Sequence, residues 1–388
     1  DPTAPSLHVG SLLPIMGLVH FQRSGHVPIA IAGGGTGMIG DPSGKSQERN
    51  LIGAEEIHAN LEGIRRQLEH FFDFNRPGNP ALIVNNADWL STLGMMDFLR
   101  DVGKHFSVNE MLARDSVKSR IAKESGISYT EFSYSVLQSY DYLALFDRHG
   151  CTLQMGGSDQ WGNIVSGIDL IRRTRTRDVH GIVYPLITTS GGAKFGKTEA
   201  GTVWLDPART SPYRFYQFWL NAGDRDVIPY LKFFTLLSRE EIDNLAGLLE
   251  REPGKRMAQR KLASEVTALL HGASGLAQAT RASEIFFGAE ISGVPEDVLL
   301  EIFADVPSSD YPRSTLAAGN VSVADLLLAA GVAASKGEAR RAIEGGGIYL
   351  NNRRVASPTD IVGEGESLHG KFLVFRKGNK NYTLVRLI

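Results

Sequence analysis

The sequence predicts an α/β protein: a doubly wound parallel, Rossmann-like domain, then an all-α domain, then a small α+β domain. Up to residue 205, short apolar runs typical of buried strands alternate with amphipathic helical patterns, as in parallel sheets covered by helices. The pattern is helical from about 211 to 303, and short helices then give way to short strands. We therefore expect a Rossmann-like domain over 1–205 with a helical insertion around 86–150, a helical domain over 206–304, a Pro-, Gly- and Ser-rich linker over 305–320, and a separate small domain over 321–388.

The composition excludes several classes of protein. The chain has 388 residues, 22% of them charged, and a formal net charge of −2, so it is not a polybasic nucleic-acid coat protein. Its single cysteine, Cys151, rules out internal disulfides and cysteine-rich zinc sites and suits a reducing cytoplasm. The histidines are scattered, no apolar run approaches the ~20 residues that span a membrane, and no secretory signal is visible. Because the first residue is Asp1, we expect the protein's own N-terminus to lie upstream.

The first eleven residues lead from a polar loop into an apolar helix. Ser6 is a suitable N-cap, and Pro14 is tolerated only near a helix start, so we expect the helix to begin between His8 and Ser11. Backbone N–H groups that stay unpaired at such an end attract anions, above all phosphate. His8 would add a donor, and Gly10 would let a ligand approach the backbone. A capped surface helix with an incidental histidine is the alternative interpretation.

A glycine-rich stretch follows the strand expected over 27–32 and matches two nucleotide-binding motifs incompletely. Within 35–40 the glycines have the spacing of the dinucleotide fingerprint. That fingerprint requires the glycines to open a helix, and Asp41-Pro42 interrupts any helix there, which argues against a dehydrogenase. The glycine spacing before Lys45 is one residue too short for a Walker loop.

Three polar side chains share one face of a helix expected over 130–146. Tyr134, Gln138 and Asp141 stand at i, i+4 and i+7, which places them in one stripe. A phenol, an amide and a carboxylate in one stripe are unusual beside a core, so we treat them as candidate site residues. A partly solvated polar face is the alternative.

Basic residues gather at two further places. Lys194 and Lys197 flank a glycine-rich loop after the strand expected over 182–188. Two lysines on a flexible loop suit a clamp on a polyphosphate. A solvated hairpin tip is the alternative.

Cations on the compact module 321–388 suggest that it binds a phosphate backbone. A solvated basic surface is the alternative. These cations are Lys336, Arg340, Arg341, Lys371, Arg376, Lys377, Lys380 and Arg386.

Together these stretches resemble the bacterial-type tyrosyl-tRNA synthetases, a family of class I aminoacyl-tRNA synthetases, over essentially the whole chain. His8-Val9-Gly10-Ser11 resembles the HIGH motif of class I enzymes, and 194–198 resembles their KMSKS loop in its tyrosyl variant. Further similarity to the family lies in 40–45, 134–141 and 156–161.

The chain departs from the family pattern at two points. Ser11 stands in place of the second motif histidine, and because a hydroxyl can still donate to a phosphate or ribose we expect a weaker interaction there and retained function. A tyrosine that the family uses to bind the substrate phenol would precede Asp1.

The resemblance implies a two-step reaction. The tyrosine carboxylate attacks the α-phosphorus of ATP to give tyrosyl-adenylate and pyrophosphate, and the terminal adenosine of tRNA(Tyr) then accepts the tyrosine. It further implies Mg²⁺ that travels with ATP, no permanently bound cofactor, and a cytoplasmic homodimer formed through the insertion 86–150. On this view 206–304 lies on the anticodon side, 321–388 binds RNA, and no membrane is involved.

The resemblance also assigns roles to individual residues. Asp41, Tyr134 and Gln138 would hold the substrate ammonium, and Asp141 would accept from the phenol hydroxyl. The implied catalytic residues are His8, Lys45, Arg49, Lys194 and Lys197; the ATP contacts are Asp1, Thr3, His8, Gly10, Ser11, Gly156, Asp159 and Lys197; the tyrosine contacts are Asp41, Asn86, Tyr134, Gln138, Asp141, Gln154 and Gln160; the tRNA contacts are Arg172 and Arg173. No protein-bound metal is expected.

Three rival functions remain at this point. Tryptophanyl-tRNA synthetases share the class I core, but Asp141 fits a phenol better than an indole. A dehydrogenase fails on the context of its glycines. A non-catalytic RNA-binding paralogue is opposed by the presence of both loop lysines, Lys194 and Lys197.

Overall fold

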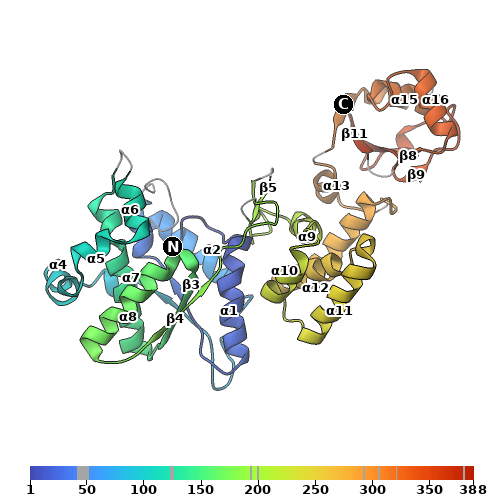
Figure 1. Ribbon diagram of the computed structural model, residues 1–388. Helices are drawn as coiled ribbons and strands as arrows, with labels where there is room; N and C mark the ends of the chain where they lie inside the picture. The colour runs from blue at the N-terminus through green and yellow to red at the C-terminus, as the bar shows by residue number, and fades with distance from the viewer. Residues whose placement is uncertain are drawn as a thin grey trace. The chain divides into compact units, whose positions relative to one another are not determined.

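The computed structural model describes residues 1–41, 52–122, 126–192, 195–198, 201–291, 293–304, 306–319, 321–378 and 381–388 (Figure 1). These residues form two compact units, which we describe separately. The first contains 1–211 and 218–270, and the second contains 212–217 and 271–388. Among the helices so described, none combines the length and the apolar character needed to cross a bilayer.

The first unit is built on two pairs of parallel strands. Strand β1 (Ile29–Ala32) pairs with β2 (Leu82–Asn85), and β3 (Leu153–Gly157) pairs with β4 (His180–Tyr184). The long helices of this region are α1 (Leu12–Arg23), α2 (Ala54–Leu68), α7 (Tyr129–His149) and α8 (Trp161–Arg175). The predicted alternation of parallel strands and helices is therefore confirmed, although β4 ends earlier than the strand expected over 182–188.

A glycine brings α1 close to the second strand pair. A Cβ atom on Gly17 would collide with the hydroxyl of Tyr184, the last residue of β4. Helix α1 and strand β3 also contact each other. The absence of a side chain at Gly17 thus lets α1 pack directly against the sheet, which brings the residues before α1 close to the strand ends.

The start of α1 differs from the expectation. The chain forms a 3₁₀ turn at Val9–Ser11 with His8 as its N-cap, and α1 proper begins at Leu12. Ser6 is buried instead: its hydroxyl donates to Leu7 O and accepts from Gln67 Nε2 at 2.9 Å. Ser6 is therefore a link to α2 and not a helix cap.

The insertion between β2 and α7 is made of short helices. They are α3 (Ala87–Leu90), α4 (Met95–Asp97), a π-helical turn (Phe98–Val102), a 3₁₀ turn (Gly103–His105), α5 (Val108–Leu112) and α6 (Asp115–Ile121). Val102 and Met111 anchor this region in a core that also contains Val136 and Tyr142 of α7 and Leu170 of α8. The insertion is thus fixed to the two helices that flank β3.

After β4 the chain forms a small hairpin and then helices. The hairpin strands are β5 (Lys197–Thr198) and β6 (Gly201–Thr202), and the helices are α9 (Pro212–Leu220), α10 (Val227–Phe234), α11 (Arg239–Arg251) and α12 (Met257–Phe286). Gly272 has a non-helical backbone inside α12, with φ of 69°. The boundary between the two units runs beside it, at Leu270 and His271.

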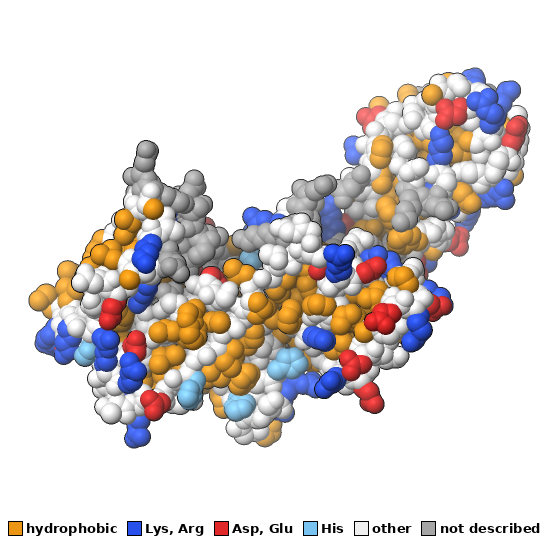
Figure 2. All heavy atoms as spheres, viewed as in Figure 1, with side chains coloured by type: hydrophobic (Ala, Val, Ile, Leu, Met, Phe, Trp, Pro, Cys, Tyr) orange, Lys and Arg blue, Asp and Glu red, His pale blue; other side chains and the backbone are white. Residues whose placement is uncertain are grey.

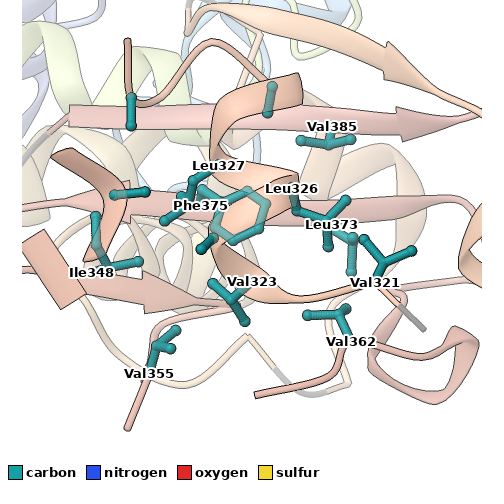
Figure 3. Packing of buried hydrophobic residues seen from close by; sticks show 14 of the residues in the cluster. Val321, Val323, Leu326, Leu327, Ile348, Val355, Val362, Leu373, Phe375 and Val385 are labelled. Carbon is teal, nitrogen blue, oxygen red and sulfur yellow. The ribbon is translucent and has the colours of Figure 1, made fainter. Parts of the chain in front are cut away.

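The second unit contains a five-stranded sheet in the order β7-β11-β10-β8-β9. Its elements are α13 (Glu296–Ile302), β7 (Ser308–Tyr311), α14 (Arg313–Ala317), α15 (Val323–Ala329), α16 (Lys336–Glu344), β8 (Ile348–Leu350), β9 (Arg353–Arg354), β10 (Phe372–Lys377) and β11 (Asn381–Leu387). Leu326 and Leu327 of α15 pack against Leu373, Phe375 and Val385 of the sheet (Figure 3). This α+β module has its own closed apolar core.

The segment 305–320 is not the linker that its composition suggested. Strand β7 pairs in parallel with β11, and Leu316 of α14 is fully buried in the module's core. The polar sequence Ser308-Ser309-Asp310 forms an edge strand, where half of the side chains face solvent and need not be apolar. Pro307 and Pro312 bracket this strand, which is where prolines are tolerated in sheets.

Candidate active site

A buried carboxylate forms the deepest part of the candidate site. Both oxygens of Asp141 accept hydrogen bonds, Oδ1 from Trp89 Nε1 at 2.7 Å and Oδ2 from Asn86 Nδ2 at 2.9 Å. Burial raises the pKa of Asp141 to about 6, although these two hydrogen bonds act in the opposite direction. The carboxylate is a strong acceptor that is held in one orientation.

Asn86 connects this carboxylate to the glycine-rich turn after β1. Its Oδ1 accepts from Gly35 N at 2.8 Å, and its Nδ2 also donates to Thr36 Oγ1 at 2.9 Å. The backbone donor identifies the oxygen side of the amide, so the orientation of Asn86 is determined. With only 1% of its surface exposed, Asn86 can act only through these partners.

Asp1 and Tyr134 continue the network. Thr36 Oγ1 donates to Asp1 Oδ1 at 2.7 Å, and the Tyr134 hydroxyl donates to Asp1 Oδ2 at 2.8 Å. A Cβ atom on Gly33 would overlap Asp1 Oδ1, so glycine is required there for the carboxylate to enter. The turn 33–38 forms a single 3₁₀ turn and opens no helix, in agreement with the exclusion of a dinucleotide fingerprint.

A second network joins Asp41, Gln138 and Gln160, three of the other residues expected to bind tyrosine. Gln160 Nε2 donates to Asp41 Oδ2 at 2.7 Å, and Asn163 Nδ2 donates to Gln138 Oε1 at 2.9 Å and to Gln160 Oε1 at 3.2 Å. Gln138 lies one turn beyond Tyr134 on α7, so this network and the Asp1 network meet on that helix face. On β3, Gln154 Oε1 is buried without a hydrogen-bond partner among the described residues.

The HVGS segment is paired with the strand that leaves the lysine loop. Val9 N donates to Val203 O at 3.0 Å, and His8 bridges to Trp204. Gly10 N donates to His8 Nδ1 at 3.0 Å, and Ser11 N donates to His8 O at 2.8 Å. The prediction of unpaired backbone N–H groups here is therefore wrong, because an antiparallel neighbour and the His8 ring use them.

The pairing of His8 defines its chemistry. Since Nδ1 accepts from Gly10, a neutral imidazole carries its proton on Nε2. A donor at this position is therefore the imidazole Nε2–H and not the helix backbone.

The two class I motifs lie in contact. A Cβ atom on Gly196 would overlap a methyl group of Val9 and lie 3.6 Å from Gly10 N, and the φ of Gly196 is +78°. Lys197, the next residue, is exposed on β5. Lys45, Arg49 and Lys194 fall outside the described residues.

The remaining residues expected to bind ATP or tRNA lie on several different elements. Thr3 is exposed, and its N–H donates to Asp1 O at 2.9 Å. Gly156 lies on β3, and Asp159 lies in the 3₁₀ turn that precedes α8 and accepts weakly from Gln160 Nε2 at 3.3 Å. Arg172 pairs with Asp169, and Arg173 donates to His105 O of the insertion; both arginines are exposed.

Three members of the networks were missed by sequence reasoning: Trp89, Thr36 and Asn163. Asn163 follows Gln160 by three residues at the start of α8, so helical spacing could have indicated it. Trp89 and Thr36 carry no local signal, because their partners come from distant segments. The pairing of β1 with β2 brings Asn86 to Thr36, and the packing of α7 beside α3 brings Asp141 to Trp89.

Comparisons with known proteins identify the family of the chain. Residues 1–288 match the family described as tRNA synthetases class I (W and Y), and residues 299–385 match the tyrosine--tRNA ligase SYY-like C-terminal domain. A tyrosine--tRNA ligase of Roseiflexus castenholzii is 55% identical over 388 residues, which is all of this chain and 92% of that protein. One of Opitutus terrae is 50% identical, with 91% of that protein covered.

Solved structures give the same result. A C-terminally truncated mitochondrial tyrosyl-tRNA synthetase from Aspergillus nidulans is 31% identical with a TM-score of 0.66, covering 74% of this chain and 84% of that one. The corresponding Coccidioides posadasii structure is 34% identical with a TM-score of 0.63, covering 72% and 81%. The chain belongs to the class I tRNA synthetases, within the family of tyrosine--tRNA ligases.

Proposed function

We propose that the networks around Asp141 and Asp41 bind L-tyrosine and that the paired HVGS and lysine-loop segments bind ATP, so that the chain forms tyrosyl-adenylate and transfers tyrosine to tRNA(Tyr). The observation that carries this proposal is the fixed Asp141 carboxylate. On a single helix it lies about one turn beyond Gln138 and about two turns beyond Tyr134. An amino acid with a distant hydroxyl therefore finds two polar ends to bind.

The tyrosine ammonium binds among oxygen acceptors. Tyr134 donates its own proton to Asp1, so toward a cation its hydroxyl oxygen acts as an acceptor. Asp41 and Gln138 supply a carboxylate and an amide oxygen, both steadied by the Gln160–Asn163 pair. Gln154, whose buried oxygen has no protein partner among the described residues, adds a further acceptor for the amino acid.

The tyrosine phenol binds at the other end. Its hydroxyl donates to Asp141, whose two present donors leave further lone pairs on the carboxylate oxygens. Asn86 contributes indirectly, because it holds that carboxylate.

ATP binds where the two class I motifs meet. His8 Nε2–H and Lys197 donate to phosphate oxygens as charge develops on them in the transition state, together with Thr3 and Ser11. Gly10 and Gly156 leave space for the nucleotide, while Asp1 and Asp159 bind its polar groups. We expect Lys45, Arg49 and Lys194 to join them, and Mg²⁺ to enter with ATP.

No protein nucleophile is needed, because the tyrosine carboxylate itself attacks the α-phosphorus and pyrophosphate leaves. Catalysis then consists of alignment and stabilisation of phosphate charge. In the second step a hydroxyl of the terminal adenosine attacks the acyl carbon and releases AMP. The exposed Arg172 and Arg173 contact the acceptor stem, the helical segment 206–304 lies toward the anticodon, and the C-terminal module binds RNA.

The protein acts as a homodimer in the cytoplasm. Met95 and Met96 on α4 of the insertion are each 75% exposed, and Leu99, Val108 and Leu112 are also exposed. Figure 2 shows hydrophobic side chains at the edge of the molecule where α4 and α5 lie in Figure 1. An apolar group of this kind on a water-facing insertion favours a second copy as its cover.

The test is amino-acid-dependent exchange of pyrophosphate into ATP. We expect exchange with tyrosine, and little with tryptophan or phenylalanine. Exchange with tryptophan alone would overturn the assignment of Asp141 to a phenol, and no exchange with any amino acid would favour a non-catalytic RNA-binding role.

A further inference from the structure

The start of the lysine loop is attached to the helical region by one carboxylate. Ser190 N lies 3.1 Å from both Oδ1 and Oδ2 of Asp226, and Ser190 Oγ donates to Oδ2 at 3.1 Å. Hydrogen bonds to an ionised carboxylate are about twice as strong as neutral ones. Asp226 is the residue before α10, and its backbone is fixed by bonds from Asp226 N to Gly223 O and from Tyr230 N to Asp226 O.

The far end of the loop is attached to the same helix by an aromatic ring. Phe195 is 6% exposed and stacks parallel to Phe234, with ring centroids 5.5 Å apart. Its ring also contacts Tyr230 at 5.2 Å and Trp219 at 5.8 Å. Helix α10 and the residue before it therefore contact the loop on both sides of Gly191 and Gly192.

Two glycines that lie between these attachments have the wide conformational freedom of residues without a side chain. Gly191 and Gly192 follow Ser190 directly, and Gly192 has a φ of +79°, a conformation that glycine adopts without strain. Lys197 lies two residues beyond Phe195 and follows Gly196, which packs on Val9. The fewer attachments the loop has, the more conformational freedom must be lost when a lysine reaches the transition state.

We propose that Asp226 is a positioning residue for adenylate formation: by holding Ser190 it fixes the loop whose Lys197 acts on the phosphates. Asp226 touches neither tyrosine nor ATP and acts only through the loop. It therefore links the helix that follows the catalytic region to the rate of the chemical step. The proposal rests on the phosphate role of Lys197.

The first test compares substitutions on the full chain in single-turnover formation of tyrosyl-adenylate. Asp226→Ala removes both carboxylate oxygens that accept from Ser190, and we expect a rate constant lower by about tenfold with an unchanged KM for tyrosine. Asp226→Asn keeps one oxygen for Ser190 N, so it should recover most of the rate. Asp224→Ala is the matched control, because Asp224 lies two residues away and accepts from Gln259 Nε2 at 2.7 Å, not from the loop.

The second test places Asp226→Ala in a Lys197→Ala background. If Asp226 acts through the loop, the second substitution adds little once the lysine is gone. Full additivity of the two effects would overturn the proposal, as would an equal decrease in Asp224→Ala or a parallel weakening of tyrosine binding. If Lys197→Ala alone leaves the rate unchanged, the phosphate role of that lysine fails, whereas an effect of Lys197→Ala without one of Asp226→Ala refutes only the positioning role.

Discussion

The indole Nε1–H of Trp89 donates a 2.7 Å hydrogen bond to Oδ1 of Asp141, the carboxylate that ends the polar stripe of α7. Trp89 belongs to the short helix α3 after β2, so the bond joins the first strand pair to the helix that carries the stripe. Together with Asn86 it opposes the effect of burial, which raises the pKa of Asp141 to about 6. Removing these donors would push that pKa closer to neutrality.

The first prediction concerns pH. A buried carboxyl whose pKa is raised to about 6 is ionised above that pH and neutral below it. The phenol donates more strongly to the ionised form, so the KM for tyrosine should rise below pH 6, by roughly tenfold for each further pH unit. Pyrophosphate exchange at several pH values measures this. In Trp89→Phe the rise should begin at a higher pH, and in Asp141→Asn, which cannot titrate, it should be absent. A wild-type KM that stays flat from about pH 7 to about pH 4.5 contradicts the assignment.

A second prediction concerns the choice of tyrosine over phenylalanine. Asp141→Ala removes a charged acceptor from the phenol, and a hydrogen bond to a charged group contributes about 1.5–3 kcal/mol. The kcat/KM for tyrosine should fall by about 10- to 150-fold while that for phenylalanine changes little. Exchange kinetics with both amino acids measure the ratio, after the melting temperature has shown that the variant is folded. Equal decreases for both substrates would make Asp141 purely structural.

The part of the site that could be predicted from sequence is the part set by local geometry. Tyr134, Gln138 and Asp141 share a face because helical spacing alone decides it, and their expected helix is α7. Trp89 lies 52 positions from Asp141, and their contact depends on how α7 packs against α3. No periodicity encodes such a contact.

The two errors at the ends of the chain have the same origin. Ser6 has the chemistry of an N-cap but is taken up by Gln67 of α2, 61 positions away. The polar segment 305–320 has the composition of a linker, yet β7 finds a partner in β11. Tertiary pairing outweighed local preference in both cases.

The third prediction concerns the lysine loop. Lys197→Ala should lower the rate of adenylate formation by ~10²-fold or more, because a preorganised cation is removed from the transition state, with little change in tyrosine binding. The same result is expected for Lys194→Ala. Lys232→Ala, an exposed lysine on α10 away from the loop, is the control. An unchanged single-turnover rate constant in both loop variants would remove the lysines from catalysis.

The fourth prediction concerns the dimer. Met95→Glu with Met96→Glu places two carboxylates in the proposed interface, where burying unpaired charge costs several kcal/mol. We expect sedimentation analysis to find a monomer for this variant and a dimer for the unaltered chain. Met257→Glu, at an exposed methionine of α12 outside the insertion, should leave the dimer intact. A dimer that survives the double substitution would assign the interface to another surface.

The last prediction concerns RNA binding by the C-terminal module, and it requires substitutions instead of a truncation. Ending the chain near Asn320 would remove Phe372 and Tyr382 from the core that buries Ile285 and Phe303, so weaker binding could reflect unfolding.

The cations of the module are also unequal as phosphate ligands. Arg376 is buried, with its guanidinium 3.8 Å from the Tyr349 ring centroid, so its place in the sequence-based footprint is wrong. The ammonium groups of three lysines already pair with carboxylates; they are Lys336 with Asp325, Lys371 with Glu296 and Lys377 with Glu338.

Arg340 and Arg341, adjacent and exposed on α16, are the stronger candidates. Arg340→Ala and Arg341→Ala should each weaken tRNA binding and reduce the slope of log affinity against log salt by ~0.9 for each phosphate that is no longer neutralised, or somewhat less on single strands. Tyrosyl-adenylate formation should not change, because neither residue lies in the catalytic unit. Lys371→Ala serves as the control, since its charge is already compensated by Glu296 at 2.9 Å. If the arginine variants keep the full salt slope, the tRNA phosphates are bound elsewhere and the basic face of α16 is simply solvated.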